Sequence, residues 1–154
     1  MKPLTDGVVT IRPPRDGDVA ALIAGRDDDS RRFLGEGSAD PRPTAVIEVD
    51  GEVVGWVDYD VDREWLLPGE VNIGYNVFPR HRGNGFATRA VELLLRRLAG
   101  RTEYTTATLL IDTSNVRSLA LAHRIGCDDP VDFGGNQYFK RALRRPPTST
   151  PGLG

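Results

Sequence analysis

A basic, glycine-containing segment at residues 80–88 (RHRGNGFAT) has the residue types and spacing that hold a phosphate group. It lies between a β-rich stretch and an amphipathic one, which places its amides at a helix start, where free N–H groups and the helix dipole attract anions. Gly83 and Gly85 would let an anion approach the main chain closely, and Arg80 and Arg82 add two permanent cations. Taken alone, such a short pattern is equally compatible with an ordinary basic turn before a helix.

Two other phosphate-binding classes fit this segment poorly. It lacks the Lys-Ser/Thr ending of a nucleotide-triphosphatase loop, and it lies in the middle of the chain rather than after a first strand. Both differences argue against a nucleotide triphosphatase and against a dinucleotide-binding fold.

Two sequence blocks together carry a resemblance to a known superfamily. Residues 77–88 (VFPRHRGNGFAT) resemble the acyl-CoA pyrophosphate loop of the GCN5-related N-acetyltransferase (GNAT) superfamily. The NVRS segment at 115–118, followed by AHRIGC at 122–127, is similar to a turn and helix of the same superfamily. Ser118 and Ala122 resemble its ribosomal-protein (RimJ/RimL-like) branch. With a weaker match at VTIRP (9–13), the resemblance covers roughly residues 8–143.

The resemblance implies a fold and a reaction. The fold is α+β, a three-layer α/β/α domain around a mixed, mostly antiparallel sheet of the acyl-CoA N-acyltransferase type. In it, the strand before the pyrophosphate loop and the following strand splay apart around acyl-CoA. The implied reaction transfers an acetyl group from acetyl-CoA directly to a primary amine, on a protein N-terminus or a small molecule, through a ternary complex. The alternative is a catalytically silent acyl-CoA-binding regulatory module with this fold.

The resemblance also assigns residues to the coenzyme. A backbone N–H near Val77 would polarise the thioester carbonyl, and Asn115 would contact the pantetheine arm, although a plain helix cap explains Asn115 equally well. The cofactor-binding residues expected on this basis are Val77, Phe78, Arg80, Arg82, Gly83, Asn84, Gly85, Phe86, Ala87, Thr88, Asn115 and Ser118.

Catalysis needs a neutral amine and a departing thiolate. Glu70, at the start of the strand before the loop, is the first candidate for the base, because it shares a predicted face with Asn72 and Asn76. A solvent-exposed carboxylate at a strand start is the competing interpretation. Many superfamily members place a tyrosine acid where this chain has Ala122, so Ser118 is the nearest replacement, unless its hydroxyl only bonds its own helix.

The acceptor side is less well specified. In this fold the early helical segment and the loop before the central strand line the acceptor groove, which implicates Asp28, Phe33 and Trp65, together with Asn72 on the polar face of the central strand. An acidic run at residues 27–29 would attract a cationic amine, and it would equally suit a solvated helix start.

Composition bounds the remaining possibilities. A chain of 154 residues suits one domain, which we place at residues 1–143, with a disordered, proline-rich tail at 144–154. A net charge of −2 gives no reason to expect nucleic acid or a membrane as partner. The lone Cys127 and an N-terminus without an apolar signal core favour the cytoplasm, and the two histidines and one cysteine form no recognisable metal set. The terminal hairpin could pair with a second copy as a homodimer.

Periodicity predicts the elements that position these residues. The segment from Asn84 to Ala99 has apolar residues at helical spacing, and residues 71–78 alternate as a strand that turns Val71, Ile73, Tyr75 and Val77 to one face. The other predicted strands are residues 8–12, 44–49, 52–61, 104–111, 131–133 and 137–143. The other predicted helices are residues 19–24, about 30–34, and one that begins at Ser114 or Asn115 and ends at Gly126.

Overall fold

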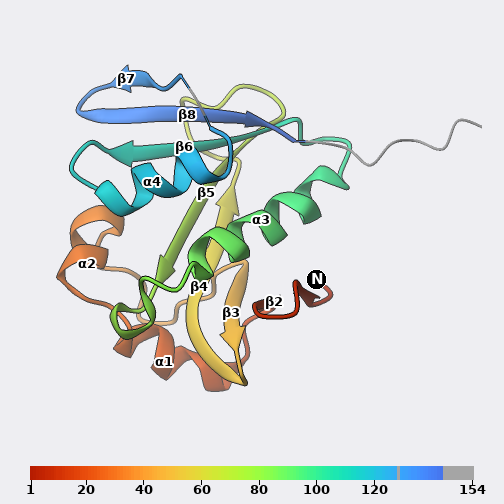
Figure 1. The fold of residues 1–154 in the computed structure, drawn as a ribbon, viewed down its shortest axis with the longest axis vertical. Coiled ribbons are helices and arrows are strands. Elements are labelled where there is room, and N and C mark those ends of the chain that lie inside the picture. Colours follow the sequence, from red (N-terminus) through yellow and green to blue (C-terminus); the bar gives the residue numbers. More distant parts are fainter. Residues whose placement is uncertain (128, 144–154) are drawn as a thin grey trace, which may run out of the picture.

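A single sheet organises the computed structural model, which describes residues 1–127 and 129–143 (Figure 1). The tail predicted at 144–154 lies outside the described residues. Within them, eight strands lie in the order β1-β2-β3-β4-β5-β6-β8-β7, and every neighbouring pair is antiparallel except β5–β6. The predicted mixed, mostly antiparallel sheet is therefore confirmed. The strands are β1 (Leu4–Thr5), β2 (Thr10–Arg12), β3 (Ala45–Val49), β4 (Glu52–Asp60), β5 (Glu70–Val77), β6 (Thr106–Asp112), β7 (Val131–Phe133) and β8 (Asn136–Ala142).

Helices cover both faces of the sheet. Along β3 the side chains alternate: Ala45 and Ile47 join the large core under α3 and α4, whereas Val46 packs with Leu22 of α1 on the other face. The result is the predicted three-layer arrangement. The helices are α1 (Val19–Ala24), α2 (Asp28–Leu34), α3 (Phe86–Ala99) and α4 (Val116–Arg124), with two 3₁₀ turns, η1 (Asp16–Asp18) and η2 (Pro79–His81).

Among the described strands, β5 and β6 form the only parallel pair, and they separate after a short contact. β5 and β6 are paired at Glu70–Thr106, Val71–Ala107 and Asn72–Thr108, and their pairing ends there. Beyond that point β5 stays paired with β4 as far as Val77, and β6 stays paired with β8 as far as Asp112. The two strands thus part at their carboxyl ends and leave a gap in the middle of the sheet.

Most of the predicted elements are present, with one difference at the N-terminus. A short strand, β1, precedes β2 and was not anticipated. The carboxylate of Asp18, at the start of α1, pairs with buried Arg12 of β2 at 2.8 Å and accepts a hydrogen bond from the Arg15 N–H within the η1 turn. This ion pair, between residues six positions apart, joins η1 to β2.

Candidate active site

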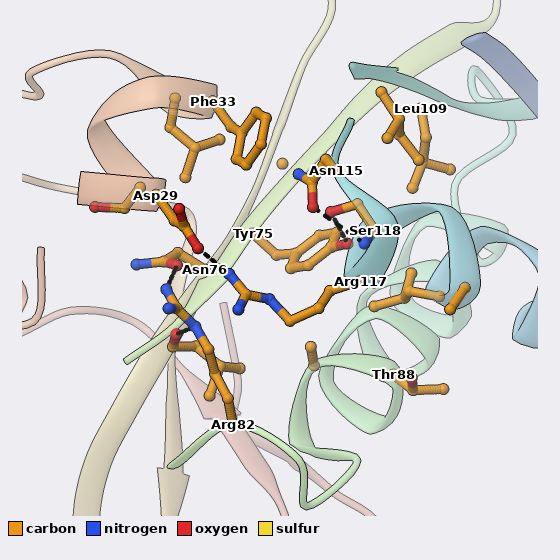
Figure 2. Close-up of a pocket in the computed structure, with 18 of the residues that line it drawn as sticks. Asp29, Phe33, Tyr75, Asn76, Arg82, Thr88, Leu109, Asn115, Arg117 and Ser118 are labelled. Carbon is orange, nitrogen blue, oxygen red and sulfur yellow. Dashed lines mark hydrogen bonds and ion pairs between the residues drawn. The ribbon is translucent and has the colours of Figure 1, made fainter. Parts of the chain in front are cut away.

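The gap between β5 and β6 opens into a cavity of about 1060 Å³ (Figure 2). Residues 73–77 of β5 form one wall and residues 109–112 of β6 the other. The starts of α3 and α4 and part of α2 complete the lining. Of the predicted cofactor-binding residues, those that line the cavity are Val77, Arg82, Gly83, Gly85, Phe86, Ala87, Thr88, Asn115 and Ser118.

The start of α3 is open toward this cavity. Gly83 and Gly85 have φ of +83° and +76°, a conformation that favours glycine, and a Cβ at either position would meet no atom within 4 Å. No side chain caps α3, whereas Asp27 caps α2 and Asn115 caps α4. The first amides of α3 are thus left for an external acceptor, as the anion-binding interpretation requires.

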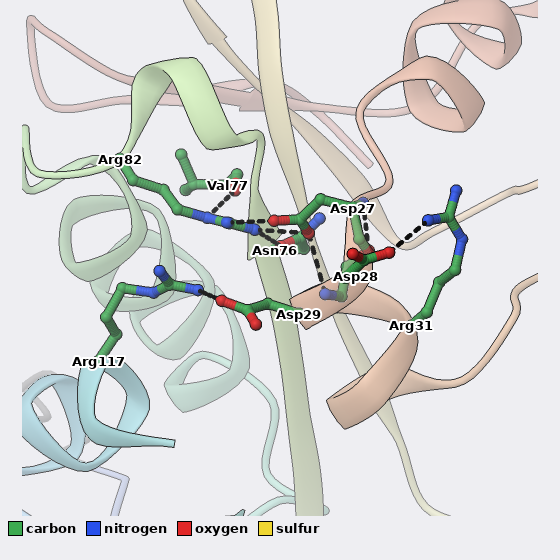
Figure 3. A network of polar contacts seen from close by, with 9 residues as sticks. Asp27, Asp28, Asp29, Arg31, Asn76, Val77, Arg82 and Arg117 are labelled. Carbon is green, nitrogen blue, oxygen red and sulfur yellow. Dashed lines mark hydrogen bonds and ion pairs between the residues drawn. The ribbon is translucent and has the colours of Figure 1, made fainter. Parts of the chain in front are cut away.

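Arg82 is not a free cation of the loop. Its guanidinium donates to both Asp27 carboxylate oxygens (2.6 and 3.1 Å), to the Val77 carbonyl (2.8 Å) and to the Asn76 amide oxygen (3.1 Å) (Figure 3). The hydrogen bonds from Arg82 hold the pKa of Asp27 well below its usual range. Arg82 therefore braces the loop against α2, and its contact with phosphate stays a prediction.

Three other predicted coenzyme contacts lie away from the cavity lining. Arg80 is mostly exposed and points to Glu52 of β4 and to His81. Phe78 is buried against Leu22, on the face of the sheet that α1 covers. Asn84 donates its side-chain amide to the His81 carbonyl and so stabilises the loop itself. All three residues belong to the loop motif in sequence, but their side chains contact other parts of the protein and not the cavity.

Sequence reasoning missed Arg89. It lies one turn into α3, lines the cavity, and pairs with Asp6 at 2.9 Å while its side chain stays 47% exposed. A cation at this point lies beside the open amides and can reach an anion bound there. Its place on the second turn of the helix predicted from Asn84 was the available signal.

Backbone amides of β5 face the gap. The Phe78 N–H donates to the Val54 carbonyl of the β4 side at 2.8 Å. Because successive N–H groups of a strand point to opposite sides, those of Tyr75 and Val77 point toward β6 and the cavity. This geometry fits the predicted role of the Val77 region as a donor to a carbonyl oxygen.

Two hydroxyl groups meet at the start of α4. The Tyr75 hydroxyl donates to Ser118 Oγ at 2.6 Å, and the Asn115 side chain accepts from the Ser118 N–H at 3.3 Å (Figure 2). Burial raises the pKa of Tyr75 to about 12, against the smaller opposite effect of the Ser118 bond. Tyr75, which the sequence places only on the same face of the strand as Val71, Ile73 and Val77, therefore joins Ser118 in the cavity wall.

Glu70 lies outside both cavities described here. Its carboxylate binds the Lys140 ammonium at 2.6 Å, the Tyr138 hydroxyl at 3.2 Å and the Leu67 N–H at 3.0 Å. Burial works to raise the pKa of Glu70, but these three donors outweigh it and leave the pKa below its ordinary value. The predicted face of Glu70 is correct, yet a paired carboxylate at the far end of β5 is poorly suited to take a proton from an amine in the gap.

A second cavity, of about 520 Å³, lies on the opposite face of the sheet. Three of the predicted acceptor residues line it: Phe33, Trp65 and Asn72. The fourth, Asp28, lines neither cavity and pairs with Arg31 within α2. Both cavities are lined by Gly74 and Asn76 of β5 and by Leu110 of β6, so they lie next to each other at the gap.

The sequence profile of the Acetyltransferase (GNAT) family matches residues 12–127, which includes the loop, the gap and α4. The chain belongs to the GNAT acetyltransferase family. No curated protein matches the chain. Solved structures share the GNAT fold: an acetyltransferase from Bacillus anthracis superposes with a TM-score of 0.74 at 16% identity, over 92% of this chain and 99% of its own.

Two further GNAT structures contain coenzyme A. RimL, a ribosomal alpha-N-protein acetyltransferase, has a TM-score of 0.73 at 14% identity and covers 92% of this chain and 98% of its own. The aminoglycoside acetyltransferase AAC(6')-Ib has a TM-score of 0.72 at 20% identity, over 87% and 94%. At such identities the likeness establishes the fold alone.

The described residues offer neither a metal cluster nor a membrane-spanning helix. Residues 1–127 and 129–143 contain no group of three His, Cys, Asp or Glu side chains placed to hold a metal ion. None of the helices in this part of the chain has the length and apolar character to cross a lipid bilayer.

Proposed function

We propose that this GNAT protein transfers an acetyl group from acetyl-CoA to a primary amine by direct attack within a ternary complex. The observation that carries the proposal is the gap between β5 and β6, which opens beside the start of α3 and shares Gly74, Asn76 and Leu110 with the second cavity. The coenzyme would lie in the larger cavity with its diphosphate on the amides of α3 and its pantetheine arm along β5.

In this arrangement the acceptor enters from the opposite face. The amine would pass Phe33, Trp65 and Asn72 in the second cavity and reach the thioester at Gly74 and Asn76. The N–H groups of Tyr75 and Val77 would stabilise the carbonyl oxygen as it becomes negative. Entry of two substrates from two faces favours direct transfer, since the nitrogen can meet the carbonyl carbon without an acyl-enzyme intermediate.

An amine panel with detection of free thiol tests the proposal. RimL acts, by its name, on a protein α-amine, and AAC(6')-Ib on an aminoglycoside, so the panel should hold N-terminal peptides, aminoglycosides and small diamines. We expect release of coenzyme A to depend on one of these amines. Absence of acetyl-CoA binding by calorimetry would refute the proposal.

The alternative is a silent acyl-CoA-binding module, and Ala122 favours it because the tyrosine acid common in the superfamily is missing there. Tight acetyl-CoA binding without thiol release on any amine of the panel would support this alternative. Turnover on a single amine would exclude it.

A further inference from the structure

The Tyr75–Ser118 contact joins two elements across the proposed coenzyme cavity. Tyr75 comes from β5, in the stretch that has separated from β6, and Ser118 comes from the first turn of α4. Both residues line the cavity, and the 2.6 Å distance between their oxygens is short even for hydroxyl groups. The contact therefore lies where the pantetheine sulfur would pass between β5 and α4.

The direction of this hydrogen bond determines where the serine proton can point. A hydroxyl carries one hydrogen, and Ser118 Oγ already accepts the hydrogen of Tyr75. Among the described residues, no other side chain or carbonyl group accepts a hydrogen bond from Ser118 Oγ. Its own O–H is therefore free to point into the cavity, toward a ligand atom.

We propose that Tyr75 and Ser118 form a two-hydroxyl relay that stabilises the departing thiolate of coenzyme A, with Ser118 touching the sulfur and Tyr75 acting as a positioning residue behind it. This inference rests on the proposed function. The amine nitrogen forms a bond to the thioester carbon, and the C–S bond breaks with its electron pair on sulfur. The Ser118 O–H donates to that sulfur while Tyr75 donates to Ser118, and chains of this kind strengthen each member.

The relay donates a hydrogen bond and does not transfer its proton. A tyrosine whose pKa is raised to about 12 would hand a proton uphill to a thiolate whose conjugate thiol has a pKa of ~8.5. The nitrogen releases its proton to water, and the thiolate is protonated from solvent when it leaves. The neutral Tyr75 hydroxyl thus remains a donor throughout the pH range in which an amine is reactive.

The pKa of the thiol of coenzyme A bound to the protein tests the relay without turnover. We would follow thiolate formation by ultraviolet absorbance against pH for the wild type, Tyr75→Phe, Ser118→Ala and the double variant. In the wild type we expect a bound-thiol pKa below ~8.5, since donors to the charged form lower a pKa. Tyr75→Phe should raise the pKa of the bound thiol by about one unit. In the Ser118→Ala background, the same substitution should not change this pKa further.

Steady-state kinetics give the second measurement. Tyr75→Phe should lower kcat about tenfold, with the affinity for coenzyme A by calorimetry changed less than about threefold. The matched control is Tyr59→Phe, a tyrosine of β4 that lines neither cavity and packs edge-on against Tyr104. Control and wild type should agree in both thiol pKa and kcat.

The outcomes separate the relay from the function on which it rests. If coenzyme A binds and amines are acetylated, but Tyr75→Phe leaves the bound-thiol pKa and kcat unchanged, the relay is overturned and the proposed function stands. Additive effects of the two substitutions would also overturn it. If coenzyme A does not bind to the wild type, the proposed function and the relay fail together.

Discussion

Arg80 and Arg82 look equivalent in sequence and have different surroundings in the structure. The side chain of Arg82 is 17% exposed and donates hydrogen bonds to Asp27, Asn76 and Val77. The side chain of Arg80 is 75% exposed and forms an ion pair with Glu52 at the surface. A bidentate guanidinium with a backbone acceptor cannot be replaced by a point charge. The two positions therefore offer a matched pair for one experiment.

We expect Arg82→Lys to lower the free energy of unfolding by about 1–3 kcal/mol, because a lysine satisfies fewer of the three acceptors. The control Arg80→Lys should stay within about 0.5 kcal/mol, since exposed ion pairs contribute little. Urea denaturation of the two variants beside the wild type measures both values. Equal stability of Arg82→Lys and Arg80→Lys would contradict the bracing role.

Gly83 tests the anion site. Gly83→Asp introduces a side chain at φ +83° and a negative charge beside the open amides of α3, so we expect acetyl-CoA affinity to fall at least about tenfold. The control is Gly135→Asp in the turn between β7 and β8, where φ is +85° and a Cβ also meets open space. Calorimetry on both variants compares the same strain with and without the site. Unchanged affinity in Gly83→Asp would remove the diphosphate from this loop.

For Glu70, the sequence and the structure predict different roles: the sequence suggests a general base, and the structure suggests a structural ion pair with Lys140. If Glu70 were the general base, Glu70→Gln should lower kcat by ~10²–10⁴. Because the structure pairs Glu70 with Lys140, we expect instead that kcat changes less than about threefold and that the free energy of unfolding falls by about 1–3 kcal/mol. Kinetics and urea denaturation on one variant measure both. A large loss of kcat at unchanged stability would restore Glu70 as the base.

At the scale of elements, α2 is tied to the cavity rim from three directions. Asp27 binds Arg82 of the loop, and Asp29 binds Arg117 of α4 at 3.1 Å (Figure 3). Arg32 donates to Ser114 at 3.1 Å. All three contacts link residues more than fifty positions apart in the chain. The helix thus spans the cavity between the α3 side and the α4 side.

The Asp29–Arg117 pair should influence how long coenzyme A stays bound. Both side chains are about half exposed, so Asp29→Asn should change stability by less than about 1 kcal/mol. With one tie broken, we expect dissociation of coenzyme A to be a few-fold faster, since a looser rim releases its ligand sooner. Asp28→Asn is the control, because within residues 1–127 and 129–143 the ion-pair partner of Asp28 is Arg31 on the same helix. Equal dissociation rates in stopped-flow experiments would show that α2 does not retain the coenzyme.

Sequence reasoning succeeded where the determining interaction was local. Alternation in residues 71–78 gave the correct faces of β5, and glycine spacing gave the start of α3, because both depend on neighbours a few positions away. It failed where a side chain found a distant partner, as Glu70 did with Lys140 and Arg82 with Asp27. The separation of β5 from β6 came from the family resemblance, since no pattern within either strand encodes it.

At the scale of the whole molecule, two ion pairs hold the helices of one face to the sheet. Asp18 and Arg12 join η1 to β2, with side chains only 10% and 7% exposed, and Asp27 and Arg82 join α2 to the loop after β5. In both pairs the arginine hydrogen bonds are the largest influence and lower the pKa of the carboxyl group. The helical layer that borders the second cavity therefore depends on two ionised carboxylates.

The ionisation of these carboxylates makes the stability of the fold depend on pH in a definite direction. A carboxyl group whose pKa is lower in the folded than in the unfolded state stabilises the fold fully above its unfolded pKa of ~3.9 and loses that contribution as the pH falls toward the folded value. We therefore expect the free energy of unfolding to decrease steeply below about pH 4.

Asp27→Asn should lower the free energy of unfolding at pH 7, and it should lose about 1–2 kcal/mol less than the wild type on acidification to about pH 3, because it has no carboxylate to protonate. Asp16→Asn removes an exposed partner of Arg42, and it should lose as much stability on acidification as the wild type does. Urea denaturation at the two pH values measures each difference, and an identical acid response in Asp27→Asn and Asp16→Asn would show that the Asp27–Arg82 pair does not set the acid limit of the fold.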